Sequence, residues 1–124
     1  ISLSINKENI SAEIFAEVLN NSIKAIKDIG GANPGDKTLL DTLVPAYEAF
    51  ENAHIKGSNF YDSLDEMKKG AYKGWQSTED MVAKIGRASR LGERSRGVLD
   101  AGATSCYLIM DSMADSIQKI LSDN

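Results

Sequence analysis

The 124-residue sequence is poor in cysteine and histidine, two residues that build disulfides, zinc sites and nucleophilic sites. Cys106 is its one cysteine, so an intrachain disulfide is excluded and the chain fits a reducing compartment such as the cytoplasm. His54 is its one histidine, and the sequence has neither a Ser-His-Asp arrangement nor the Cys and His spacing of zinc sites. These shortages argue against a catalytic triad, and we expect the chain to supply no metal ligands.

Long apolar runs and an excess of positive charge are also missing. No run reaches the roughly 18 apolar residues of a membrane span, and no signal peptide is visible, so we expect no membrane partner. The formal net charge of −4 argues against a nucleic-acid partner, because such binders carry a basic surface. Positive charge gathers locally in residues 86–102, where four arginines outnumber Glu93 and Asp100. This pattern favours a local anion site.

Apolar residues recur at helical spacing along almost the whole chain. The pattern predicts an all-α fold with about four long antiparallel helices, over 11–28, 37–55, 60–84 and 103–122. Ser11 is the expected N-cap of the first helix.

Three features modify the predicted second and third helices. Thr38 and Asp41 resemble a capping box with Asp in the Glu position. Pro45 cannot bond the carbonyl of Asp41, so we expect a loosened turn there. Gly70 and Gly74 lie one turn apart in the third helix, where each costs about 1 kcal/mol relative to Ala. We therefore expect a neighbouring segment to approach these glycines closely.

The segment 86–105 reads GRASRLGERSRGVLDAGATS and combines four arginines with four glycines. Arginine forms charge-assisted bonds with phosphate, and glycine lets the backbone approach a ligand. The functional interpretation is therefore an anion or partner site. The alternative is a solvated surface loop in which Glu93 pairs with one arginine, and composition alone leaves both open.

Two further segments lead into predicted helices. Asp100 to Ser105 enters the last helix, whose first turn presents unpaired N–H groups to an anion. Capping of the helix by Asp100, or by one of Thr104 and Ser105, is the commoner use of such residues, and both uses can hold at once. Gly30 to Thr38 has the glycine spacing of a P-loop, but Asp36 stands where that motif requires lysine. Taken alone, the second segment is a turn followed by a helix cap.

Together, PGDKT-x-x-D-x-x-x-P, which ends at Pro45, and the segment 86–105 resemble the nucleotide-binding L subunit of dihydroxyacetone kinase. The resemblance extends from the first predicted helix to the C-terminus. It implies part of an eight-helix barrel that binds ADP or ATP with Mg²⁺ at one end. It places six residues at the nucleotide: Gly30, Leu39, Arg87, Asp100, Ala101 and Gly102. Arg87 would also act in catalysis by adding positive charge there.

The sequence departs from the family at three places. Leu39 stands where the family often has methionine, which preserves an apolar contact to adenine, and Ala101 replaces a frequent proline. The Asp-x-Asp-His-Gly segment that holds Mg²⁺ and a Gly-Gly-Ala-Ser-Gly loop are not in this sequence. Residues 1–124 therefore resemble the C-terminal part of a single L-type domain, with the magnesium ligands elsewhere in the intact parent. We expect this chain alone to be inactive, and its apolar surface to favour self-association.

The resemblance also implies a reaction and partners. The intact parent would transfer a phosphoryl group from the bound nucleotide to dihydroxyacetone, which a partner K subunit holds. In the phosphotransferase-dependent branch of the family, ADP would stay bound and an M-type subunit would rephosphorylate it. In the ATP-dependent branch, ATP would exchange at the site. Two alternatives stay open: a nucleotide-binding domain like that of fatty-acid kinases, and a non-catalytic helical module that docks a partner through its Arg-rich loop.

Overall fold

The described part of the chain folds into helices only. The computed structural model describes residues 2–30, 35, 37–81, 97 and 99–123. Within these residues it has four α-helices and one 3₁₀ turn: α1 (Ser2–Gly30), α2 (Leu40–Ile55), α3 (Phe60–Ser77), η1 (Thr78–Asp80) and α4 (Ala101–Asp123). The predicted all-α class is confirmed.

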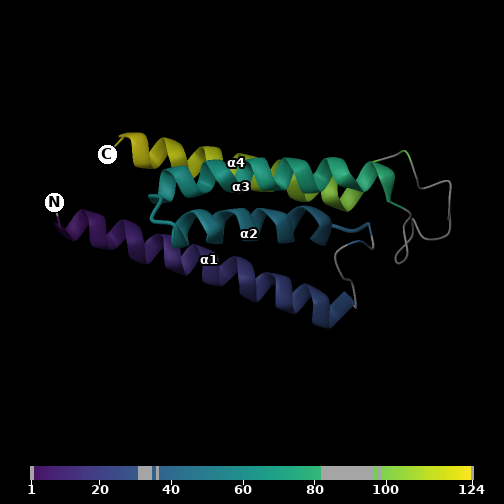
Figure 1. Cartoon of the computed structure of the whole chain (residues 1–124), viewed down its shortest axis with the longest axis horizontal. Helices are drawn as coiled ribbons and strands as arrows, with labels where there is room; N and C mark the ends of the chain where they lie inside the picture. Colours follow the sequence, from purple (N-terminus) through teal and green to yellow (C-terminus); the bar gives the residue numbers. More distant parts are fainter. Residues whose placement is uncertain (1, 31–34, 36, 82–96, 98, 124) are drawn as a thin grey trace.

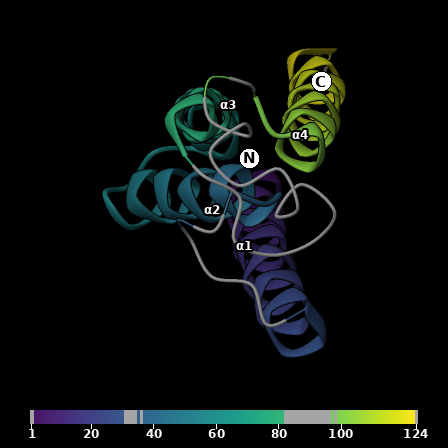
Figure 2. The same ribbon diagram turned by 90° about the vertical axis from the view of Figure 1, so that its right-hand side faces the viewer.

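The four helices alternate in direction along the long axis of the molecule (Figure 1). Both chain termini lie at one end. The opposite end gathers the end of α1, the start of α2, the end of α3 and the start of α4, and Figure 2 looks onto this end. The described ends of the two segments that the sequence singles out therefore lie at the same end of the bundle.

The first two helices begin elsewhere than the sequence predicts. α1 begins at Ser2, so Ser11 lies inside a helix and is not its N-cap. Residues 2–10 contain no proline or glycine to break the helix, which continues through them. α2 begins at Leu40 because Lys37 has a left-handed backbone with a φ of 61°, which no α-helix accommodates.

The third helix is shorter than predicted, and the fourth is slightly longer. α3 ends at Ser77 and passes through η1 to Met81, whose backbone is extended at φ −88° and ψ 154°. The apolar pattern continues beyond this turn, which is why periodicity overestimates the helix. Residues 82–84 lie outside the described residues. α4 starts at Ala101, directly after Asp100, which caps it.

The core lies between the four helices. α1 contributes a buried stripe that includes Ala12, Leu19 and Ile23. Phe50 of α2 is fully buried, and its ring centroid lies 5.1 Å from that of Phe15 and 5.9 Å from that of Phe60. Aromatic pairs at these separations stabilise a core beyond their buried area. This cluster joins α1, α2 and α3.

The α2–α3 contact is unusually close because of three backbone features. Pro45 has no N–H for the Asp41 carbonyl, and that carbonyl faces Gly74, where a Cβ would overlap it. A Cβ on Gly70 would lie 2.6 Å from the carbonyl oxygen of Pro45. The expectation that these glycines admit a neighbouring helix is confirmed.

None of the described helices combines the length and the apolar character that a membrane crossing requires.

Candidate functional site

The loop before α2 is held by one carboxylate. Asp41 accepts hydrogen bonds from the N–H groups of Gly35 at 2.6 Å and Thr38 at 2.9 Å. The hydroxyl of Thr38 accepts from the N–H of Leu40 at 3.2 Å. The predicted capping relationship between Thr38 and Asp41 is therefore present, although the Thr38 side chain bonds the nearer N–H. This network fixes the backbone that leads into Leu39.

Lys37 joins this loop to the end of the α3 region. Its side chain is buried, with only 3% of the residue exposed, and its Nζ donates to the carbonyl of Met81 at 3.2 Å. Nearby, the N–H of Gly97 donates to the carbonyl of Glu79 at 2.6 Å. The chain therefore leaves η1 and returns to it at nearly the same point.

The arginines that the sequence singles out lie in the sequence between Met81 and Gly97, the two residues whose backbones make these hydrogen bonds. Arg87, the predicted catalytic residue, lies outside the described residues, as do Arg90, Arg94 and Arg96. Their roles stay predictions.

Asp100 caps the first turn of α4. Its carboxylate accepts from the N–H of Ala103 at 2.8 Å, and its carbonyl accepts from the N–H of Thr104 at 2.9 Å. This confirms the capping interpretation of Asp100. Ala101 and Gly102 are exposed, and neither N–H has an acceptor among the described residues. The positive end of the helix dipole is thus presented to solvent.

The starts of α2 and α4 touch at Leu39 and Gly102. A Cβ built on Gly102 would lie 3.8 Å from the Cβ of Leu39 and 3.2 Å from a carboxylate oxygen of Asp100. The hydroxyl of Thr42, one turn into α2, donates to the carbonyl of Ala103 at 3.0 Å. Four of the predicted nucleotide residues therefore form one cluster at this end: Leu39, Asp100, Ala101 and Gly102.

Gly30, another predicted nucleotide residue, is the last residue of α1 and lies at the same end of the bundle (Figure 2). No hydrogen bond given for the described residues joins it to that cluster.

Sequence reasoning missed a ring of hydrogen bonds beneath the first turn of α4. The Thr78 hydroxyl donates to the carbonyl of Trp75 at 2.7 Å and accepts from the N–H of Asp100 at 3.0 Å. The Thr104 hydroxyl donates to the carbonyl of Asp100 at 2.7 Å and accepts from the indole N–H of Trp75 at 2.7 Å. We call these four residues the Trp75–Asp100 ring. One feature of the sequence could have indicated this ring: Thr78 is a polar residue at a position of the third predicted helix where the pattern calls for an apolar one.

Aromatic stacking extends this ring along α4. The indole of Trp75 stacks on the ring of Tyr107 with a centroid distance of 4.6 Å and an interplanar angle of 5°. Burial raises the pKa of Tyr107, and the negative charge of Asp111 raises it further. Burial alone raises the pKa of Cys106 to about 11, so its thiol stays protonated and behaves as a core residue.

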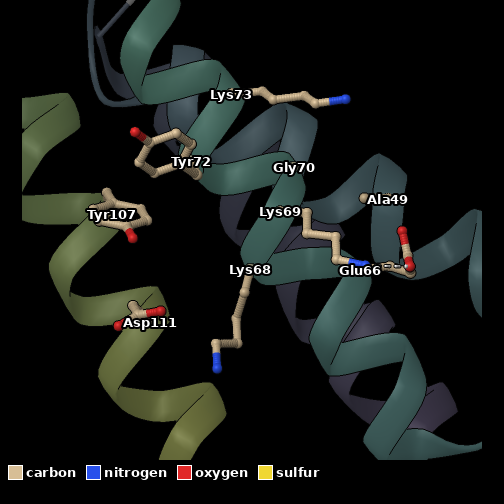
Figure 3. Close-up of a pocket in the computed structure, with 9 residues that line it drawn as sticks. All are labelled: Ala49, Glu66, Lys68, Lys69, Gly70, Tyr72, Lys73, Tyr107 and Asp111. Atoms are coloured by element: carbon tan, nitrogen blue, oxygen red, sulfur yellow. Dashed lines mark hydrogen bonds and ion pairs between the residues drawn. The ribbon is translucent and has the colours of Figure 1, made fainter.

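A surface groove of about 570 Å³ opens where Tyr72 and Tyr107 face one another across α3 and α4 (Figure 3). Lys68 projects between the two helices and donates to Asp115 at 2.5 Å, and this hydrogen bond raises the pKa of Lys68. The described residues that line the groove include none of the predicted nucleotide residues. The groove and the Leu39–Gly102 cluster are therefore separate features.

Metal ligands are scarce around the cluster. The described residues contain no group of three or more His, Cys, Asp or Glu side chains that could hold a metal ion. The carboxylates of Asp41 and Asp100 already accept backbone N–H bonds. The described part of the chain therefore does not fit a Mg²⁺ site.

The sequence matches known proteins over most of its length. The pattern of the DAK2 domain matches residues 2–115. A probable dihydroxyacetone kinase of Dictyostelium discoideum is 37% identical over 119 residues, which cover 91% of this chain and 18% of that protein. The ADP-binding subunit DhaL of PEP-dependent dihydroxyacetone kinase 2 of Listeria innocua is 33% identical over 116 residues, which cover 91% of this chain and 52% of that subunit. A D-erythrulose kinase of Mycolicibacterium smegmatis is 35% identical over 106 residues, which cover 86% of this chain and 18% of that enzyme.

These matches differ in how much of the relative they cover. The chain spans about half the length of the Listeria subunit and less than a fifth of the other two proteins. The match at 2–115 includes both segments that carry the resemblance and all six predicted nucleotide residues. The resemblance to the L subunit of dihydroxyacetone kinase is thus confirmed, and the chain belongs to the DAK2 domain family.

Proposed function

We propose that this chain forms part of the nucleotide site of a ketose kinase of the dihydroxyacetone kinase type. The observation that carries the proposal is the exposed first turn of α4, where Ala101 and Gly102 present N–H groups beside Leu39. Helix N-termini bind phosphate because the unpaired N–H groups and the helix dipole both favour negative charge. The name of the Listeria relative, an ADP-binding subunit, supports a nucleotide as the anion.

Each member of the cluster has a distinct part in this proposal. Ala101 and Gly102 would donate to phosphate oxygens, and the absence of a side chain at Gly102 leaves room for the backbone to approach them. Leu39 is half-buried and would contact adenine through its apolar side chain. Asp100 would orient the turn by capping it. Gly30 would border the nucleotide from the end of α1.

Arg87 would supply positive charge at the transferred phosphoryl group. Arginine suits this role because its guanidinium stays charged and matches phosphate geometry. Arg87 lies outside the described residues, so its part rests on the resemblance and on the relatives' names.

The described residues contain no group of three or more side chains that could hold Mg²⁺. A magnesium ion in the intact enzyme would take its ligands from outside this chain, as the resemblance implies. The residues described here would bind and orient the nucleotide.

The proposed reaction moves a phosphoryl group from the bound nucleotide to a hydroxyl of dihydroxyacetone carried by a K subunit. The Listeria relative is named as PEP-dependent, which supports an M-type phosphoryl donor as a further partner, whereas ATP exchange would replace that donor in the other branch. We propose a cytoplasmic location, which the single cysteine of the sequence supports. Relatives named as kinases favour this proposal over a fatty-acid-kinase-like domain or a non-catalytic docking module.

Erythrulose is a second candidate substrate. A relative with 35% identity is named D-erythrulose kinase, so a similar sequence occurs in a protein named for another small ketose. Phosphorylation assays with dihydroxyacetone and with both erythrulose enantiomers distinguish the candidates.

A charge-reversal variant tests the nucleotide site. Gly102→Asp places a carboxylate where phosphate is proposed to bind. The new Cβ would lie 3.2 Å from a carboxylate oxygen of Asp100, so circular dichroism must show that α4 still forms in this variant. In calorimetric titrations of the protein expressed from its complete gene, we expect ADP affinity to fall by at least about tenfold, because like charges at close range oppose binding. Ser112→Asp, on an exposed part of the same helix, is the matched control. Equal ADP affinity in the Gly102→Asp variant and the unmodified protein would overturn the proposal.

A further inference from the structure

Thr78 lies directly beneath the first turn of α4 and is fully buried. Its hydroxyl is the single link between the carbonyl of Trp75 in α3 and the N–H of Asp100 in the Trp75–Asp100 ring. Asp100 in turn caps α4 through Ala103. The position of Asp100, and with it the direction of the Ala101 and Gly102 N–H groups, therefore depends on a hydroxyl at the start of η1, directly after α3.

We infer that Thr78 is a positioning residue for phosphate binding at the first turn of α4, an inference that rests on the proposed function. Thr78 contacts no ligand in this arrangement, because it is fully buried below the turn. It acts through Asp100, whose backbone it holds at 3.0 Å. Anion-binding donors gain strength from being fixed before the ligand arrives, because no binding energy is then used to order them.

The closed form of the ring strengthens this role. Thr104 ties the carbonyl of Asp100 to the indole N–H of Trp75, so Asp100 is held at both its N–H and its carbonyl. Each polar atom that closes the ring has a partner within it, and such satisfied networks make a structure rigid. Loss of the Thr78 hydroxyl would leave the Asp100 N–H and the Trp75 carbonyl without this partner.

The ring also contains its own spectroscopic probe. Trp75 is the single tryptophan of the chain, and its indole is hydrogen-bonded to Thr104 and stacked on Tyr107. Phosphate binding at Ala101 and Gly102 acts on the helix turn to which that indole is bonded. We therefore expect ADP to change the fluorescence emission of Trp75.

A pair of substitutions separates the hydroxyl from the shape of the side chain. Thr78→Val keeps the branched shape and removes the hydroxyl, whereas Thr78→Ser keeps the hydroxyl. In the protein from its complete gene, we expect Thr78→Val to weaken ADP binding about tenfold, the effect of losing one buried hydrogen bond. It should also abolish the ADP-induced change in Trp75 emission, and Thr78→Ser should restore both.

Ser63→Ala is the matched control, because Ser63 is a fully buried α3 residue whose hydroxyl has no partner among the described residues. It should leave ADP affinity unchanged. If Thr78→Val fails to fold, as circular dichroism would show, Thr104→Val opens the same ring at a less buried position and should give the same two losses. Full ADP affinity in a folded Thr78→Val or Thr104→Val protein would overturn the inference. Absence of ADP binding by the unmodified protein would instead overturn the proposed function.

Discussion

Gly74 of α3 lies against the backbone carbonyl of Asp41 in α2, so closely that a Cβ at position 74 would overlap the carbonyl oxygen. The same Cβ would lie 2.9 Å from the Cγ of Pro45. Pro45 leaves that carbonyl without its helical hydrogen bond, so the proline of one helix and the glycine of the other form a single packing arrangement.

This relationship predicts that Gly74→Ala destabilises the fold. Alanine favours a helix by about 1 kcal/mol over glycine. Here the new methyl group meets backbone that cannot yield without moving α2, and overpacking of this kind costs about 1–3 kcal/mol. Urea unfolding should therefore show a net loss of stability. Ser112→Ala, at an exposed position of α4, should stay within about 0.5 kcal/mol, and a stabilised Gly74→Ala protein would show that the helices are farther apart.

The buried thiol of Cys106 should make the free energy of unfolding depend on pH. Burial raises its pKa in the folded protein from 9.0 to about 11. Above pH 9 the unfolded chain therefore loses its thiol proton while the folded protein keeps it. The stability that the buried, protonated thiol contributes is complete below pH 9. It disappears as the pH rises through the pKa of the folded protein, about 11. Unfolding measured from pH 8 to pH 11 should show a steeper loss of stability for the natural protein than for Cys106→Ala, and parallel curves would contradict the burial of the thiol.

Self-association follows from apolar side chains on two helices. Ile14 and Val18 of α1 are each 54% exposed, and Leu108 and Ile109 of α4 are 60% and 64% exposed. Exposed apolar side chains that gather into large patches drive association in water. Light scattering of the 124-residue chain should therefore show dimers or larger species, and Val18→Lys with Ile109→Lys should shift the population toward monomers. A monomer at every concentration tested would contradict this expectation.

The fold was predictable because its signals are local, whereas part of the site was not. Helical periodicity located all four helices, and Asp100 was identifiable as a cap because a cap bonds residues three positions away. The end of α3 was misjudged because apolar residues continue past Thr78, although the backbone turns there. Thr78 and Trp75 could not be linked to Asp100 and Thr104, because these contacts join residues more than twenty positions apart and depend on how α3 packs against α4.

The arginine segment gives a prediction that rests on the resemblance. In the protein from its complete gene, Arg87→Ala should reduce ADP affinity or the rate of phosphoryl transfer by about ten- to a hundredfold, as expected for the loss of hydrogen bonds from a charged group. Arg96→Ala should change either quantity by less than about 0.5 kcal/mol, as for an ordinary surface charge. Side-by-side kinetics and ADP titrations of the two variants check this. A larger loss for Arg96→Ala would mean that the anion site lies elsewhere in the segment.

The most direct test of the account follows individual backbone N–H groups by nuclear magnetic resonance while ADP is added to the ¹⁵N-labelled protein from its complete gene. The account predicts saturable shifts of the Ala101 and Gly102 amide signals, because these N–H groups would donate to the phosphates. The Gly57 signal, from the turn between α2 and α3 at the opposite end of the bundle, should stay in place. Saturable ADP binding that leaves the Ala101 and Gly102 signals unmoved would contradict the account.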